Sequence, residues 1–359
     1  MLPADRPGLL LIAALIAILA ILIASTLLLT AAIRYRRRHA DRRRARAQEL
    51  ARPRLMEALA ADPDDIDTGD IEEWAQPYLE TMAAGLAAKL RGGDRAGLVS
   101  LLDRRGTVAA TIARTRNLSP VRRMEAVELL GGLGVETAVP EVVARIDDQD
   151  GEVARTAVRS LGRIGSTQAL PALLMAVNSD DYEVPDIYLT LAMLRMGPAA
   201  VEPLEDALRV HGPGARTAAA QVLGWLGEPR ALGPLTEAVQ DPEPQVRAAA
   251  VGALGRLGMP EAFEAISTQL AAEQPATVRL PAIEALGRLG DDRAVLELGG
   301  LLGTDHHVNM AAAQALSALG GRGRELLADH THLPEVREVL GILPTPADPA
   351  DADLEEAVR

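Results

Sequence analysis

Apolar residues recur with the period of an α-helix along most of the chain. In residues 246–258 (VRAAAVGALGRLG) five of them fall at spacings that place them on one face of a helix. These are Val246, Ala250, Val251, Leu254 and Leu257. A second stretch of helical spacing follows at 230–239 in the preceding copy, and a polar loop, 241–245 (DPEPQ), leads into the next one. The pattern predicts a hairpin of two α-helices.

This hairpin pattern is repeated. Copies of the first helix stand at 122–134, 153–165, 185–197, 215–227, 246–258, 278–290 and 308–320, and each ends on a glycine. The closing glycines follow one another at intervals of 30 to 32 residues, and a fixed period in this range indicates an array of identical supersecondary elements. Each hairpin has apolar residues on more than one side and buries them only by stacking on its neighbours. The sequence therefore predicts an all-α fold, an α-solenoid of about seven helical hairpins.

Glycine has two expected roles in each copy. The closing glycine, Gly258 in this copy, suits the left-handed conformation that ends a helix. Gly255, one turn earlier, removes a side chain where a neighbouring helix approaches.

The hairpins resemble short HEAT-like repeats of the phycobilisome-lyase type over about 121–343. The resemblance rests on V-R-x-x-A-x-x-x-L-G-x-x-G followed by an A-[LV]-x-x-L helix. It implies a ladder in which a turn aspartate bonds to a helix arginine, and Asp241 and Arg247 match that pairing. Arg123, Arg216 and Arg279 stand in the same arginine column. The 185–197 copy has Asp186 in that column, which indicates either a distorted repeat or simple drift.

The same resemblance bears on enzymatic activity. HEAT-like iron hydroxylases carry His-Glu dipeptides, and this chain has none. HEAT-like DNA glycosylases need a basic groove with aromatic residues, whereas only 2% of this chain is aromatic. Neither activity is expected here.

Residues 8–33 contain no charged residue. At about 1.5 Å per helical residue this length exceeds the roughly 30 Å hydrocarbon core of a bilayer, so we expect one transmembrane helix. A cleaved signal peptide is the alternative, but its positive charge would precede the apolar run. The arginines here follow the run, which predicts a single-pass protein of the inner (plasma) membrane with its N-terminus outside and its repeats in the cytoplasm.

Residues 34–54 hold ten arginines against Asp41 and Glu49, a net charge of +8. The membrane-proximal basic residues are Arg36, Arg37, Arg38, Arg42, Arg43 and Arg44. We expect this segment to set the topology and to contact anionic lipid head groups. The whole chain carries −13, which leaves −21 for residues 55–359. Such an acidic body disfavours nucleic acid and favours a protein partner, membrane-bound or bearing a basic segment.

The expected organisation has seven parts. They are a short extracytoplasmic N-terminus (1–7), the transmembrane helix (8–33), the arginine-rich segment (34–54), an acidic linker (55–73), an N-terminal helical cap (74–120), HEAT-like repeats (121–343) and an acidic tail (344–359).

Catalytic signatures are missing from the sequence. Lys89 is its one lysine, so it contains no GxxxxGK[ST] phosphate loop, and it has no cysteine to form disulfides or thiolate metal sites. We therefore expect no catalytic residue and no cofactor. Four histidines gather near the C-terminus: His306, His307, His330 and His332. They are either exposed loop residues or a metal site.

Partner binding is expected on the second helices, which usually line the concave face of HEAT arrays. The candidates there are Glu141, Glu205, Glu237, Glu264 and Glu297. Such a face attracts a basic segment, although these residues also suit a solvated surface. Trp225 replaces an arginine of the other copies and is either a partner anchor or a packing residue between repeats.

These observations favour a membrane-anchored cytoplasmic scaffold or adaptor that binds a partner protein without catalysis. The alternatives are a subunit of a bilin-lyase-like enzyme, and a metal-binding protein that uses the C-terminal histidines.

Overall fold

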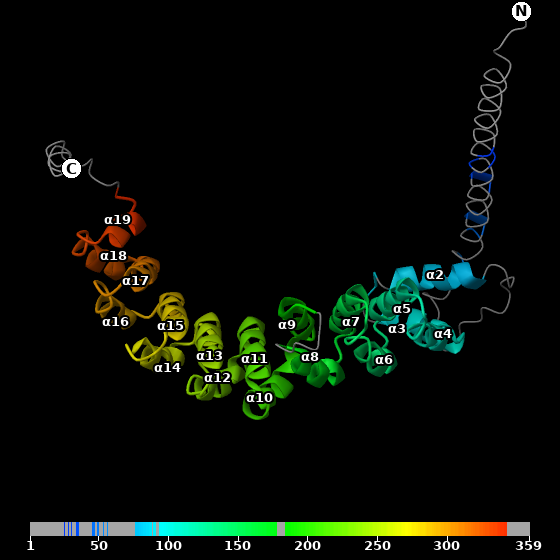
Figure 1. The fold of residues 1–359 in the computed structure, drawn as a ribbon, viewed down its shortest axis with the longest axis horizontal. Helices are drawn as coiled ribbons and strands as arrows, with labels where there is room; N and C mark the ends of the chain where they lie inside the picture. The colour runs from blue at the N-terminus through cyan, green and yellow to red at the C-terminus, as the bar shows by residue number, and fades with distance from the viewer. Residues whose placement is uncertain are drawn as a thin grey trace, which may run out of the picture. The chain divides into compact units, whose positions relative to one another are not determined.

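The computed structural model describes residues 76–87, 89–90, 93–177 and 184–342, with isolated positions at 25, 28, 30, 34, 35, 45, 46, 49, 53 and 56. Within these residues every regular element is helical (Figure 1). The chain divides into two units, residues 1–110 and residues 111–359. The boundary falls inside helix α4 (Thr107–Arg114).

Unit 1 contains a pair of helices, α2 (Gln76–Ala87) and α3 (Gly93–Arg104), which contact each other. Their small and branched apolar residues are buried. These are Ala83, Ala84 and Ala87 on α2, and Leu98, Leu101 and Leu102 on α3.

Unit 2 is a row of helical hairpins. The first, long helices are α5 (Pro120–Leu133), α7 (Gly151–Ile164), α9 (Asp186–Arg195), α11 (Pro213–Leu226), α13 (Pro244–Leu257), α15 (Ala276–Leu289) and α17 (His306–Ala318). The second, short helices are α6 (Val139–Val143), α8 (Leu170–Ala176), α10 (Val201–Val210), α12 (Leu232–Ala238), α14 (Phe263–Ser267), α16 (Ala294–Gly299) and α18 (Gly321–Ala328). The five short helices from α6 to α14 each follow a 3-10 turn, and α19 (Pro334–Val339) closes the row. In Figure 1 the long helices from α7 to α15 form one layer and the short helices form the other.

The solenoid agrees with the sequence-based expectation, but the transmembrane part of that expectation is wrong. Among the described residues, no helix is both long and apolar enough to cross a bilayer. Of the proposed span 8–33, the structure describes only Ser25, Leu28 and Thr30. We therefore correct the fold class to an α-solenoid of HEAT-like hairpins, and we withdraw the assignment to the inner membrane as a single-pass protein.

Other expected segments lie outside the described residues, apart from isolated positions. They are the N-terminus (1–7), the arginine-rich segment (34–54), the acidic linker (55–73) and the acidic tail (344–359).

Five of the closing glycines adopt the predicted left-handed conformation at the end of a long helix, namely Gly134, Gly165, Gly227, Gly258 and Gly290. Gly320 has a positive φ but a ψ of −137°, which lies outside the left-handed region. Gly134, Gly165, Gly197, Gly227, Gly258, Gly290 and Gly320 have φ between 64° and 83°. The N–H of Gly258 donates to the carbonyl of Leu254, so the glycine also satisfies one of the last free carbonyls of α13. Helices α5, α7, α11, α13 and α15 thus end where their glycine allows the backbone to reverse, whereas the C-caps of α9 and α17 are Met196 and Leu319, the residues before theirs.

A second glycine column sets the spacing between long helices. A Cβ on Gly224 would lie 2.6 Å from Ala253, and one on Gly255 would lie 2.6 Å from Ala285. Gly131, Gly162 and Gly287 meet the next long helix in the same way, at Ser160, Ala192 and Ala315. Neighbouring long helices therefore pack with backbone against backbone, and the expected role of Gly255 is confirmed.

The arginine ladder is present, and Arg123 and Arg216 each pair with the aspartate in the loop that follows their own hairpin. Arg216 donates from Nε to Asp241 Oδ2 at 2.8 Å and from Nη2 to Oδ1 at 2.9 Å. Arg123 makes the same bidentate pair with Asp148, at 2.9 and 2.6 Å. The predicted partner of Asp241, Arg247, instead donates to its backbone carbonyl at 2.8 Å. The aspartate therefore bonds to the arginine of the preceding hairpin.

Helix α9 departs from the other long helices. It has 10 residues, whereas α7, α11, α13 and α15 each have 14. Leu194 takes the position that holds glycine in α7, α11, α13 and α15. Helix α9 therefore lacks the glycine that lets the other long helices pack closely on the next one, as expected of a distorted repeat.

Candidate functional site

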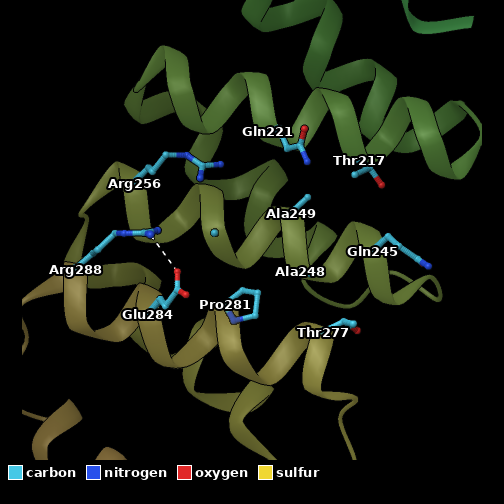
Figure 2. A pocket seen from close by; sticks show the side chains of 11 residues that line it. Thr217, Gln221, Gln245, Ala248, Ala249, Arg256, Thr277, Pro281, Glu284 and Arg288 are labelled. Carbon is cyan, nitrogen blue, oxygen red and sulfur yellow. Dashed lines mark hydrogen bonds and ion pairs between the residues drawn. The ribbon is translucent and has the colours of Figure 1, made fainter. Parts of the chain in front are cut away.

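A groove lies on the exposed face of the long helices, over α13 and between α11 and α15 (Figure 2). Its volume is about 480 Å³. Ala248, Ala249 and Gly252 of α13 form the floor, Thr217 and Gln221 of α11 line one side, and Thr277 and Pro281 of α15 line the other. Glu284, Arg256 and Arg288 lie at one end, and Gln245 lies toward the other.

The groove exists because α13 has small residues where its neighbours have larger ones. Gly252 aligns with Gln221 of α11 and with Glu284 of α15. Ala248 likewise aligns with Thr217 and with Leu280. Only Arg256 Nη1, at 3.7 Å, comes within 4 Å of a Cβ placed on Gly252. The space above α13 is therefore open and is not filled by another part of the described chain.

Polar side chains along the groove have donors and acceptors available for hydrogen bonds. Within the described residues, the side-chain amides of Gln221 and Gln245 make no hydrogen bond. Each amide offers both donors and an acceptor, the complement of a peptide bond. The hydroxyl of Thr217 donates to the carbonyl of Pro213 at 2.9 Å and retains acceptor capacity. The groove suits an extended polypeptide that has unpaired backbone groups.

The end of the groove is cationic. The Arg256 guanidinium lies over the ring of Trp225, with its Cζ 4.8 Å from the ring centroid. Its Nε is buried, lacks a hydrogen-bond partner within the described chain, and lies 3.0 Å from where a Gly224 Cβ would stand. Arg288 nearby donates to Glu284 at 3.1 Å. Of the two guanidinium groups at this end, only that of Arg288 is paired with the Glu284 carboxylate.

The environment of Arg256 disfavours its charge. Burial, and to a smaller extent the positive charge of Arg288, lower the pKa of Arg256 from its ordinary value. No salt bridge to Arg256 occurs within the described residues to offset this. The cation–π contact with Trp225 is the interaction that stabilises the Arg256 charge here.

The five glutamates expected on the second helices lie on α6, α10, α12, α14 and α16, and each already has a partner. Glu141 pairs with Arg116, with Arg116 Nε 3.0 Å from Oε2. Arg230 donates to both carboxylate oxygens of Glu205, at 3.1 and 3.2 Å. Three further pairs are Arg209 with Glu237, Arg293 with Glu264, and the Ser267 hydroxyl with Glu297.

These contacts connect consecutive hairpins. The partners stand 25 to 30 residues apart in sequence, about one repeat. The carboxylates therefore bridge neighbouring hairpins in this structure. Their role in binding a basic partner stays a prediction. The amides of Gln221 and Gln245, which make no hydrogen bond within the described residues, lie on the other face, that of the long helices.

Trp225 makes a contact between repeats, and its role as a partner anchor stays a prediction. Its side chain is 61% exposed, and Arg256 of the next long helix covers one face of the ring. It is thus a contact between repeats that remains accessible beside the groove.

The basic residues expected near the membrane are Arg36, Arg37, Arg38, Arg42, Arg43 and Arg44, and all six lie outside the described residues. The expected contact with lipid head groups falls there too.

The C-terminal histidines lie in two separate pairs. The ring centroids of His306 and His307 are 5.5 Å apart, and those of His330 and His332 are 5.9 Å apart. His306 Nδ1 contacts the buried Glu335 carboxylate at 2.7 Å. Within the described chain, no group of three or more His, Asp or Glu side chains is placed to hold a metal ion.

The fold and groove define a class of protein, a helical-repeat solenoid. The sequence pattern of HEAT repeats matches residues 108–186, 201–284 and 232–317, more than half of the chain. The chain belongs to the HEAT-repeat family. Among curated proteins, none matches its sequence.

Several solved structures share this fold. A mutant of Kap121p has a TM-score of 0.51 at 15% identity, over 77% of this chain and 36% of that one. Human deoxyhypusine hydroxylase, in complex with glycerol, matches at 19% identity with a TM-score of 0.31, covering 76% of this chain and 96% of its own. The CpcE–CpcF complex of phycocyanin lyase from Nostoc matches at 20% identity and 0.30, over 66% and 92%. At these identities the likenesses show the fold alone, and the match to the HEAT-repeat pattern confirms the HEAT-like resemblance noted from the sequence.

Proposed function

We propose that the chain is a non-catalytic protein-binding scaffold whose long-helix groove holds an extended segment of a partner protein. The observation that carries this proposal is the open groove over Gly252, lined by side chains of three consecutive long helices.

The shape of the groove favours a polypeptide over a small molecule. The groove is open along α13, and its floor consists of Ala248, Ala249 and Gly252. Small-molecule sites are enclosed and mostly bury their ligand, whereas an extended chain presents backbone donors and acceptors along one line. The amides of Gln221 on α11 and Gln245 on α13 can form hydrogen bonds with the backbone of such a chain.

The helices that form the groove are closely packed. The groove spans the two helix pairs α11/α13 and α13/α15, in which Gly224 and Gly255 bring the backbones together. A site on closely packed helices needs little ordering when it binds, so less binding free energy is lost to entropy.

The sharpest test fills the groove. Gly252→Gln places in α13 the side chain that α11 carries at this position. Gln is a better helix former than Gly by roughly 0.5–1 kcal/mol, so the variant should be at least as stable as the wild type. Purified full chain is used to select binders from a displayed library of random peptides. We expect the selected peptides to bind the wild type and to lose binding to Gly252→Gln.

Gly85→Gln is the matched control. Gly85 is an exposed glycine within α2, and a Cβ there meets nothing within 4 Å. This variant should keep full binding. Peptides that bind Gly252→Gln as well as the wild type would refute the groove as the binding site.

A further inference from the structure

The two parts of the groove differ in charge. Its central part is lined by neutral groups, and its charged end has two arginines and one glutamate. This stands against the acidic character of the chain, whose net charge is −13. Local charge, not net charge, decides which group binds at contact distance.

Arg256 is placed to receive an anion. Its Nε is covered, but Nη1 lies 3.7 Å from where a Gly252 Cβ would stand, so this end of the fork lies over the groove floor. Figure 2 shows the side chain running from α13 toward Gln221 of α11. A guanidinium presents planar N–H donors that match the two oxygens of a carboxylate.

The neighbouring charges leave this position open. Arg288 is engaged by Glu284 across one helical turn, while Arg256 has no carboxylate among the described residues. The contact with the Trp225 ring restricts the Arg256 side chain, which reduces the entropy lost when a second partner binds.

We propose that the partner segment bound in this groove carries an acidic side chain whose carboxylate pairs with Arg256, between the Trp225 ring and Arg288. This inference rests on the proposed function, because it names the chemistry of the segment that the groove holds. It assigns Arg256 as the specificity-determining residue and Trp225 as the residue that positions it. The partner then differs from the basic segment expected for the second-helix face.

The test uses the same full chain and the same displayed random-peptide library. We expect the selected peptides to be enriched in Asp or Glu at one position. The tightest peptide is then synthesised with Glu and with Gln at that position. The Gln peptide should bind the wild type about tenfold to a hundredfold more weakly, the loss expected for a charge-assisted hydrogen bond.

Arg256→Gln completes a double-mutant cycle. This variant should weaken the Glu peptide by a similar factor and should weaken the Gln peptide little further, because the two substitutions remove the same pair. Arg163→Gln is the control: Arg163 holds the same repeat position on α7, is exposed, and lies 3.8 Å from Glu128. It should leave both affinities unchanged. Trp225→Leu should reduce the preference for Glu over Gln while retaining binding of the Gln peptide.

The outcomes separate the two proposals. If peptides bind wild type but not Gly252→Gln, with no acidic preference or no coupling to Arg256, the acidic partner is refuted and the groove remains. If no peptide distinguishes wild type from Gly252→Gln, both proposals are overturned.

Discussion

Gly255 of α13 lies directly against Ala285 of α15: a Cβ on Gly255 would stand 2.6 Å from the Ala285 Cβ and 2.7 Å from its Cα. Gly252, three residues earlier on the same helix, faces open space apart from the end of Arg256. The two glycines therefore have opposite reasons to lack a side chain.

We expect Gly255→Ala to destabilise the array and Gly252→Ala to stabilise it. At Gly255 the new methyl group forces two backbones apart, which costs about 1–3 kcal/mol and outweighs the helix-propensity gain of about 1 kcal/mol. At Gly252 only the gain remains. Urea unfolding followed by circular dichroism measures both variants. Equal effects of the two substitutions would show that close packing of α13 on α15 does not limit stability.

The arginine ladder should contribute more than the exposed ion pairs. Arg216→Met leaves the nearly buried Asp241 carboxylate without its two charge-assisted hydrogen bonds, and we expect a loss of about 1.5–3 kcal/mol. Arg322→Met removes an exposed contact with Asp292, and such pairs contribute about 0–1 kcal/mol. Thermal unfolding of both variants compares them. A smaller loss for Arg216→Met than for Arg322→Met would contradict this ranking.

The Asp148 carboxylate should make stability depend on acid pH. Burial raises its pKa, but the hydrogen bonds from Arg123 and from the Asp150 N–H, with the charges of Arg123 and Arg145, outweigh burial and leave the pKa below its ordinary value. A lowered pKa in the folded state means that the stabilisation is complete above the unfolded value, about pH 4, and is lost as the pH falls through the folded value.

We therefore expect Asp148→Asn to be less stable than the wild type at neutral pH and to lose less stability on acidification. Unfolding midpoints measured between neutral and strongly acidic pH test this. Parallel pH curves for the two proteins would show that Asp148 does not carry the acid dependence.

The docking of the closing helix α19 should depend on His306. Glu335 is 7% exposed, its Oε2 lacks a hydrogen-bond partner within the described chain, and its Oε1 contacts His306. His306→Ala removes this partner, so amide hydrogen exchange over residues 334–339 should accelerate. His307→Ala, which leaves the contact intact, serves as the control. Equal exchange in both variants would show that α19 is held by its apolar contacts, such as that of Val336.

Much of unit 2 follows from the sequence. The period of the closing glycines predicts the hairpins, and the need for φ near +70° explains why glycine recurs there. The glycine of the second column was also interpretable, because a missing side chain in an apolar helix face indicates a close neighbour. The lengths of the short helices are harder to predict, because those from α6 to α14 each follow a 3-10 turn whose spacing is close to that of an α-helix.

The site was harder to predict. Glu205 and Arg230 stand 25 residues apart, and only the stacking of hairpins shows that they neutralise each other. The groove does have a sequence signal, the small residues Ala248 and Gly252 where the adjacent copies carry larger ones. That signal appears only when the copies are compared position by position. The charge-free run at 8–33 and the arginines that follow it led to the membrane assignment, which no described helix supports.

The glycine column also bears on how such a chain changes in length. Each glycine in it contacts only the long helix that follows, so a duplicated hairpin inserted in register meets the same surfaces on both sides. A duplicate of residues 244–275 would place Ala248 and Gly252 on two adjacent long helices, so the groove between the walls on α11 and α15 would become wider. Arrays of this kind can therefore change the width of a binding groove by gene duplication while the packing between their long helices stays the same.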